Sequence, residues 1–270
     1  MQITIINDCQ DQNAKLRQVS RAGSYFKNAS VNCFGVNSEL EAAGFLLDAI
    51  DAFEGREGII LANVAPRNGN AHKWKNGTPF GYFWHKKTLV VTTVDGLILS
   101  LVKKYGIIEK LYIFEIKEAL AAIKKNELSD ETKNRIIASQ FRSYDFLPRA
   151  AYWIKKNINL PKKEFDLGLI PDISNKIWFT DNFGNAKTTI DSLSLGERKN
   201  VAMKINGNAL NLNYYKCLRD LKDGETGIVC GSSGVFENRF LEIMTQGRNT
   251  ANMLNLKTGD DVEIMPDNQI

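Results

Sequence analysis

The chain has 270 residues, of which 43% are hydrophobic and 24% are charged, a composition typical of globular proteins and sufficient for one large or two modest domains. Its 35 Lys and Arg residues exceed its 31 Asp and Glu residues only slightly, and the basic residues stand in short, scattered runs. Such runs are typical of solvated helix and loop faces, so the charge pattern does not favour nucleic acid as a partner.

The first half of the chain alternates short β-branched apolar runs with segments of helical period, which predicts a largely parallel sheet covered by helices. Ser38 precedes the second helical segment and Glu41 follows three residues later, a capping pattern. The apolar runs at 80–84 and 88–93 predict a hairpin in the same sheet. The expected strands are 3–7, 29–36, 58–64, 80–84, 88–93 and 111–114, and the expected helices are 13–26, 38–53, 97–105, 116–125, 132–139 and 148–156.

The second half changes character after Asn157, where helical segments give way to short strands separated by Asp-Asn, Asn-Gly and Asp-Gly turns. This change predicts a boundary near Asn159, with an α/β domain at 1–159 and a β domain at 160–270. We expect the second domain to be a small antiparallel barrel or sandwich with one helix. The expected strands are 176–180, 186–190, 200–205, 226–230 and 261–264, and the expected helix is 248–254.

The residue types that usually carry catalysis or bind metals are scarce. The four cysteines form no CxxC pair, and the only histidines are His72 and His85. The sequence has no GxGxxG motif after a strand, no Walker loop, no GxSxG and no HExxH. We therefore expect neither a metal site nor a bound cofactor.

The start of the chain resembles neither a leader peptide nor a membrane segment. Met1 leads directly into an apolar strand without a basic region or cleavage site, and Asp95 interrupts the most apolar stretch, 88–102. This predicts a cytoplasmic protein without a membrane partner.

Three polar segments stand where ligands commonly bind. Asp8 follows the first strand, where open α/β sheets bind ligands, and it could accept both ribose hydroxyls or form an Asx turn or helix cap. The Asp181–Asn185 segment lies between two expected strands; its asparagine offers the donor and acceptor that adenine needs, although a plain hairpin turn is also open. The Gly-Ser-Ser-Gly segment at 231–234 suits a carboxylate or a flexible polar loop.

The two C-terminal motifs are the most specific. Residues 181–190 read D-N-F-G-N-A-K-T-T-I, and residues 232–234 read S-S-G. In this order they resemble D-x-F-G-N-x-x-T-N-I and N-S-S-G of the S-adenosylmethionine (SAM) hydrolase, or hydroxide adenosyltransferase, and halogenase family, which includes the fluorinase and chlorinase. The resemblance continues over nearly the whole chain, through 3–8, 59–69, 94–97, 140–145 and 231–254.

The resemblance implies a Rossmann-like N-terminal α/β/α domain with a mostly parallel sheet and a C-terminal antiparallel β-barrel or sandwich. It implies SAM, or another adenosine compound, as the ligand, bound between the N-terminal domain of one subunit and the C-terminal domain of its neighbour in a homotrimer. The implied substrate-binding residues are Asp8 for the ribose diol, Asp181 for the methionine amino group, Ser232 for its carboxylate, Asn185 for adenine with Phe183 nearby, and Phe141.

The sequence departs from the family's pattern at the groups that orient the nucleophile. Ala65 stands where the hydrolases have Asp and the halogenases Tyr. In the hydrolases' F-H-G-R-D motif, Arg142 replaces the His and Tyr144 replaces the Arg. Ser143 and Asn68 fall where the fluorinase has a Ser and a Thr that contact the halide. The candidate catalytic residues are therefore Asn68, Arg142 and Ser143, and a halide stays open as the nucleophile.

We expect an enzyme that displaces methionine from the ribose 5′ carbon of SAM, with water as the nucleophile and adenosine and methionine as products. A sulfonium is already an activated leaving group, so the reaction needs an in-line nucleophile, exclusion of bulk water and a rigid cradle rather than a metal or a covalent residue. A SAM-dependent halogenase is one alternative. Another is a non-catalytic binder of SAM or adenosine compounds, because the cradle residues are retained beside a lost Asp and His.

Overall fold

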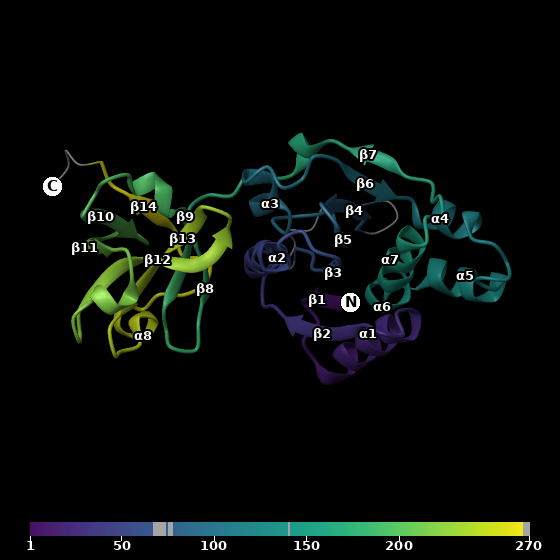
Figure 1. The fold of residues 1–270 in the computed structure, drawn as a ribbon, viewed down its shortest axis with the longest axis horizontal. Helices are drawn as coiled ribbons and strands as arrows, with labels where there is room; N and C mark the ends of the chain where they lie inside the picture. The colour runs from purple at the N-terminus through teal and green to yellow at the C-terminus, as the bar shows by residue number, and fades with distance from the viewer. Residues whose placement is uncertain (67–73, 75–77, 140, 267–270) are drawn as a thin grey trace. The chain divides into compact units, whose positions relative to one another are not determined.

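The chain folds into two units, Met1–Asp172 and Ile173–Ile270 (Figure 1). The structure is a computed structural model that describes residues 1–66, 74, 78–139 and 141–266. Strand β7 (Lys163–Phe165), which follows the predicted boundary at Asn159, pairs with a strand of the first unit's sheet. Each unit has its own sheet of seven strands.

The sheet of the first unit combines parallel and antiparallel strands, as the sequence predicted. Its strands are β1 (Gln2–Asn7), β2 (Ser30–Gly35), β3 (Gly58–Asn63), β4 (Phe80–His85), β5 (Thr88–Thr93), β6 (Leu111–Phe114) and β7. They lie in the order β2-β1-β3-β5-β4-β6-β7, and the first four of this order run parallel. The predicted hairpin is confirmed, because β4 pairs antiparallel with β5 in a register that joins Phe80 to Thr93 and His85 to Thr88.

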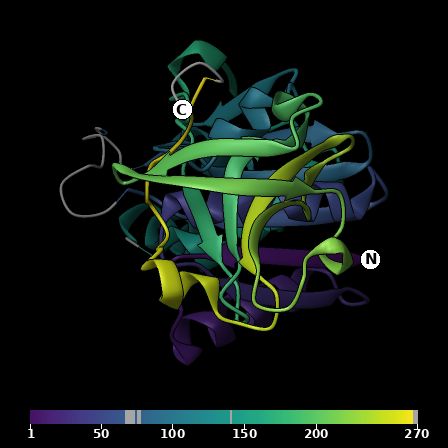
Figure 2. The same ribbon diagram turned by 90° about the vertical axis from the view of Figure 1, so that its left-hand side faces the viewer.

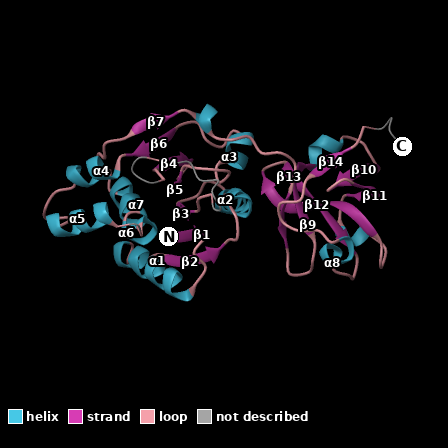
Figure 3. Cartoon of the chain, turned by 180° about the vertical axis from the view of Figure 1, so that it is seen from behind, coloured by secondary structure: helices cyan, strands magenta, loops and turns pink. Residues whose placement is uncertain are grey.

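Helices cover both faces of this sheet (Figures 1 and 3). They are α1 (Gln12–Tyr25), α2 (Glu39–Phe53), α3 (Ser100–Lys104), α4 (Ile116–Ala122), α5 (Asp130–Ala138), α6 (Arg142–Asp145) and α7 (Leu147–Lys155). α1, α6 and α7 pack together on one face, and α2 packs with α3 on the other. Every residue of β5 is therefore buried, which explains its continuous apolar and β-branched sequence. On the α7 face, Trp153 packs with Ile59 and Val91 of the central strands.

The predicted cap of α2 is present in a slightly altered form. The Ser38 hydroxyl accepts a hydrogen bond from the backbone N–H of Glu41 at 3.1 Å. The Glu41 carboxylate turns back to Asn37 and accepts from its backbone N–H at 2.7 Å and its side-chain amide at 3.1 Å. Glu41 is only 4% exposed, so these bonds satisfy a carboxylate whose burial would otherwise be costly.

The second unit is a mostly antiparallel, nearly closed barrel, seen face-on in Figure 2. Its elements are β8 (Ile177–Thr180), β9 (Ala186–Asp191), β10 (Asn200–Ile205), β11 (Asn208–Tyr215), β12 (Thr226–Val235), β13 (Asn238–Thr245), α8 (Thr250–Leu254) and β14 (Val262–Ile264). The strands lie in the order β14-β10-β11-β12-β13-β9-β8, with β11 and β12 parallel.

Backbone hydrogen bonds close this barrel between its first and last strands. The N–H of Ile177 donates to the carbonyl of Asp260, and the N–H of Val262 donates to the carbonyl of Asn175, both at 2.9 Å. Strands β7, β11 and β13 were not among the predicted elements. β11 contains Asn208, Asn211 and Asn213, a residue type that is more common in turns than in strands. All three are exposed, and β11 pairs with β10 on one side and β12 on the other. This pairing outweighs their low strand propensity.

Candidate substrate-binding site

The carboxyl ends of β1, β3 and β5 meet at one edge of the first sheet, where open α/β sheets bind ligands. Asp8 directly follows β1, and its backbone N–H donates to the Asn63 carbonyl at the end of β3, at 3.3 Å. The Asn63 amide donates to the Asn7 side-chain oxygen at 3.2 Å, and the Asn7 amide donates to the Cys9 carbonyl at 2.6 Å. These bonds hold the segment that carries Asp8 at the sheet edge.

A second carboxylate, Asp95, follows β5 at the same edge. It accepts hydrogen bonds from the indole N–H of Trp74 and from the backbone N–H of Gly96, both at 3.0 Å. Glu39, the first residue of α2, accepts from the backbone N–H of Leu97 at 2.9 Å. Burial raises the pKa of Glu39, the Leu97 N–H opposes this shift, and the nearby Asp95 charge adds to it. The two acids thus fix the loop after β5.

Two hollows of the first unit meet at Trp74. The larger, of about 400 Å³, is lined by Trp74, 94–96, Leu99, Phe165 and 169–171. The smaller, of about 260 Å³, is lined by Trp74, 78–79, 113–117, Ile137 and Arg142. The larger one falls within the range of small-molecule sites, about 300–1,000 Å³.

The candidate catalytic residues lie in different surroundings. Arg142 begins α6 and lines the smaller hollow, where burial lowers the pKa of its guanidinium. Ser143 is the next residue of α6. Phe141, the predicted substrate-binding residue directly before the helix, is 63% exposed. Ala65 lies just beyond β3 at the sheet edge. Asn68 lies outside the described residues. The catalytic roles of Asn68, Arg142 and Ser143 stay predictions.

Asp181 organises the turn between β8 and β9. Its Oδ1 accepts from the backbone N–H groups of Phe183 and Asn185, both at 2.9 Å, and its Oδ2 accepts from the Asn185 amide at 2.9 Å. An ionised carboxylate has about four lone-pair sites, so these bonds leave one for a further donor. Asn185 likewise keeps its carbonyl oxygen and its second amide hydrogen. Phe183 is 70% exposed.

A distant segment packs directly against this turn. Gly184 has a φ of +85°, and a Cβ at this position would lie 2.2 Å from the Asn249 side chain. The Gly184 carbonyl accepts from the backbone N–H of Ala251 at 2.9 Å. Asn249 also caps α8 by accepting from the Asn252 N–H at 2.8 Å. The motif at 181–190 and the Arg-Asn-Thr-Ala segment at 248–251 therefore form one structural feature.

Ser232 lies in a separate feature of the barrel. It stands where the pairing of β12 with β13 shifts register, between Cys230 and Gly234. The Arg239 guanidinium donates to the carbonyls of Ser232 and Gly234 at 3.1 and 3.0 Å, which holds the segment within the strand. Ser232 is exposed. β13 separates β12 from β9, so Ser232 and the Asp181–Asn185 turn lie on non-adjacent strands.

Comparison with known proteins assigns the second unit. Residues 175–263 match the family model described as the SAM hydroxide adenosyltransferase C-terminal domain. The second unit belongs to this family. The match spans the Asp181–Asn185 turn and Ser232, and it confirms the predicted family for this part of the chain. No curated protein matches the chain.

Solved structures of similar fold cover both units. An uncharacterized conserved protein from Thermotoga maritima matches with a TM-score of 0.70 and 16% identity over 97% of this chain and 100% of its own. A conserved hypothetical protein from Thermus thermophilus matches with a TM-score of 0.60 and 15% identity over 97% of this chain and 99% of its own. At these identities the likeness concerns the fold, and it agrees with the predicted α/β unit followed by a β-barrel.

Asp95 and Glu39 were not among the predicted site residues. The signal for Asp95 was present, because the Val-Asp-Gly-Leu segment at 94–97 directly follows a buried strand at the same sheet edge as Asp8. In the described part of the chain, no three His, Cys, Asp or Glu side chains gather as a metal ion would require. Nor is any helix there long and apolar enough to cross a membrane.

Gly184→Ala is expected to destabilise the second unit more than Gly207→Ala. The two glycines have nearly the same φ, +85° and +86°, so both variants carry a similar backbone strain of roughly 1–2 kcal/mol. Only the Gly184 variant adds an overlap with Asn249, since nothing lies within 4 Å of a Cβ on Gly207. Urea unfolding of both variants measures the difference, and equal loss of stability would contradict the packing described.

Proposed function

We propose that the chain binds SAM and displaces methionine from the ribose 5′ carbon with water. The observation that carries the proposal is the Asp181–Asn185 turn within the matched family domain. Its carboxylate keeps one acceptor site for an ammonium group, and Asn185 keeps the donor and acceptor that adenine requires.

The remaining substrate contacts follow from the resemblance. Asp8 would accept the ribose hydroxyls, Ser232 would donate to the methionine carboxylate, and Phe183 and Phe141 would pack against the ligand. The larger hollow beside Trp74 supports a small-molecule site at the sheet edge of the first unit. The homotrimer is likewise a proposal, which sedimentation of the purified chain tests.

The proposed reaction is a single displacement. A water oxygen forms a bond to the 5′ carbon while the bond from that carbon to sulfur breaks, and the electron pair of the broken bond neutralises the sulfonium. The water then loses a proton to the solvent, giving adenosine and methionine. Ser143 and Arg142 are proposed to orient the water, since Ala65 has no group that can do so. The Arg142 charge would oppose sulfonium binding if it pointed at the sulfur.

Incubation of the purified chain with SAM, followed by chromatography, tests this reaction. We expect adenosine and methionine in equal amounts, with no dependence on added chloride or fluoride. A 5′-halo-adenosine product would instead identify a halogenase. If neither product forms, the proposed reaction is wrong.

A non-catalytic SAM binder is the second candidate, favoured by Ala65 and Arg142, which replace the hydrolases' Asp and His. Calorimetry with SAM and adenosine distinguishes the two. Tight binding without product supports the binder, and absence of binding to both compounds contradicts both candidates.

Asp181→Asn is expected to weaken SAM binding by about 2 kcal/mol, roughly thirtyfold, because it removes the charge that faces the ligand's ammonium. Asparagine keeps an Oδ1 for the backbone N–H groups of Phe183 and Asn185 but loses the bond that Oδ2 accepts from the Asn185 amide, so urea unfolding of the variant is measured beside its affinity. Asp191→Asn is the matched control, since Asp191 Oδ1 accepts a similar bond from the Leu193 N–H at 2.8 Å outside the proposed site. Unchanged affinity of the Asp181 variant in calorimetry would exclude the ammonium contact.

Ala65→Asp is expected to raise the rate of adenosine formation by restoring an acid that can orient water at the sheet edge. Ala65→Asn, of similar size but uncharged, is its control. Both rates come from the same chromatographic assay. An acid variant no faster than the wild type would show that the replacement at Arg142, or another substrate, determines activity.

A further inference from the structure

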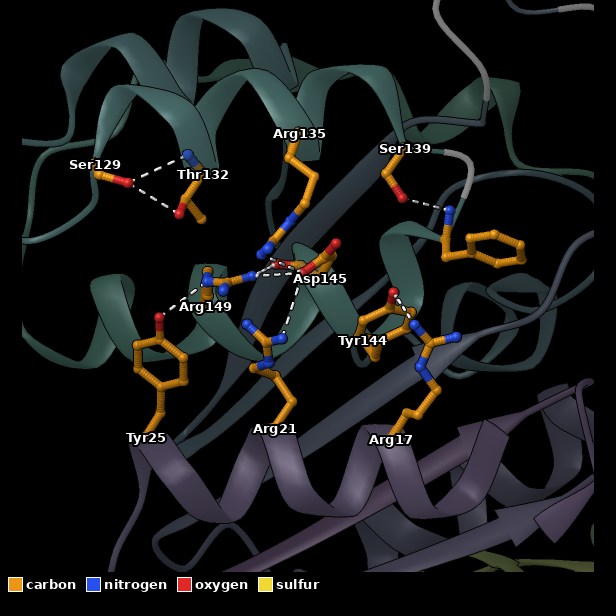
Figure 4. A network of polar contacts seen from close by, with 11 residues as sticks. Arg17, Arg21, Tyr25, Ser129, Thr132, Arg135, Ser139, Tyr144, Asp145 and Arg149 are labelled. Carbon is orange, nitrogen blue, oxygen red and sulfur yellow. Dashed lines mark hydrogen bonds and ion pairs between the residues drawn. The ribbon is translucent and has the colours of Figure 1, made fainter. Parts of the chain in front are cut away.

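The first unit contains a third hollow, of about 700 Å³, on its α1 side. Its lining residues come from α1, α5 and α6, and Figure 4 shows Arg17, Arg21, Arg135, Tyr144 and Asp145 from close by. None of its lining residues is a predicted substrate residue or lines the hollows beside Trp74. The lining residues are Leu16, Arg17, Ser20, Arg21, Ser24, Arg135, Tyr144 and Asp145.

The single carboxylate that lines this hollow, Asp145, already forms an ion pair with a buried arginine of α7, Arg149. Asp145 is 3% exposed, and the equally buried Arg149 of α7 donates to its Oδ1 at 2.9 Å. Arg149 also donates to the Asp145 backbone carbonyl and, through Nε, to the Tyr25 hydroxyl at 2.9 Å. One arginine and one carboxylate thus form a neutral, hydrogen-bonded pair beneath the hollow.

Two further arginines converge on the same carboxylate oxygen without a hydrogen bond to it. Arg21 of α1 lies 3.6 Å and Arg135 of α5 lies 3.7 Å from Asp145 Oδ1, beyond hydrogen-bond distance. Within the described residues neither has another carboxylate within 4.0 Å. Their side chains are 25% and 59% exposed, so both guanidinium groups reach solvent.

A third arginine is held in place by an aromatic ring. Arg17 lies one helical turn before Arg21 on α1, and its guanidinium stacks over the Tyr144 ring at 4.0 Å from the centroid. Arg17 Nη2 also donates to the Tyr144 hydroxyl. No carboxylate of the described chain pairs with Arg17. Ser20, between the two arginines on α1, is exposed and lines the same hollow.

The charges of these groups do not balance. A structural role in joining α1, α5 and α7 through Asp145 accounts for the positions of Arg21, Arg135 and Arg149, but one carboxylate neutralises only one of these charges. With Arg17, three positive charges stay uncompensated around the hollow. Among the described residues the ion pairs of Asp145 are with Arg21, Arg135 and Arg149, so such a role does not explain the position of Arg17 on Tyr144. Converging guanidinium groups repel one another, and an anion with more than one charge would remove that repulsion.

We propose that this hollow binds the phosphoryl group of a small phosphorylated ligand, with Arg17, Arg21 and Arg135 as its cationic partners and Ser20 as a hydroxyl donor. A phosphate monoester carries close to two negative charges at neutral pH and offers three acceptor oxygens, which match several guanidinium forks better than one carboxylate does. The site shares no lining residue with the proposed SAM site but adjoins it, because Arg17 lies 5.9 Å from the ring centroid of Phe141.

Calorimetric titration of the full chain with inorganic phosphate and with pyrophosphate, at constant ionic strength, tests the proposal. We expect saturable binding that is tighter for pyrophosphate. Arg21→Gln and Arg135→Gln should each weaken it by about tenfold or more, the loss typical of a charged hydrogen bond. Arg135→Lys should fall between, because it keeps the charge and loses the fork. Arg56→Gln is the control, since Arg56 is an exposed arginine paired with Glu54 at 2.8 Å.

Absence of saturable binding of both anions would overturn the proposal, as would an equal loss in the Arg56 variant, which indicates general electrostatic attraction. Hydrogen exchange of the wild-type chain serves where a variant fails to fold: pyrophosphate should protect the amides of α1 and α5, and no protection counts against the site. SAM binding by the Arg21 and Arg135 variants is expected to be unchanged, so failure of the SAM proposal and failure of this one are separate results.

Discussion

The hydrogen bonds of the Asp181 carboxylate are the interaction on which the candidate ligand site of the second unit depends. Two backbone N–H groups and one side-chain amide of the same turn converge on this carboxylate. Hydrogen bonds to a charged group contribute about 1.5–3 kcal/mol each, so the carboxylate determines the shape of the turn before any ligand arrives. Asn249 supports the turn from outside and leaves room only for a glycine at position 184. A ligand would therefore meet a preorganised surface, which reduces the entropy lost on binding.

At the sheet edge of the first unit, the hydrogen bonds of Asp95 and Glu39 go to the protein itself. Asp95 already accepts from Trp74 and Gly96, and Glu39 holds the Leu97 N–H, so these acids fix the loop. The described residues directly after β3, 64–66, contribute no polar side chain there. Chemistry at this edge would thus rest more on orientation and exclusion of water than on an acid or base.

The sequence predicted the local features well and the long-range ones poorly. β6 and β10 lie at the predicted residues, because short runs of aliphatic and aromatic residues, or of alternating apolar and polar residues, bounded by turns indicate strands directly. Asp181 and Asn185 could be assigned to one turn because four residues separate them. The basic cluster could not be found in this way, since Arg17, Arg135 and Tyr144 come together only through the packing of α1, α5 and α6. The sequence analysis assigned no role to any of these arginines, because each stands alone among other residue types.

The closure of the barrel has a consequence for how such proteins can diverge. The backbone bonds from Ile177 to Asp260 and from Val262 to Asn175 bring the two ends of the matched segment next to each other. A domain whose entry and exit points are neighbours can be exchanged, inserted or permuted without opening its core. A barrel of this kind can be conserved as one domain while the domain joined to it changes in sequence. In this chain the family match covers the barrel, and the α/β unit is similar to solved structures in fold alone.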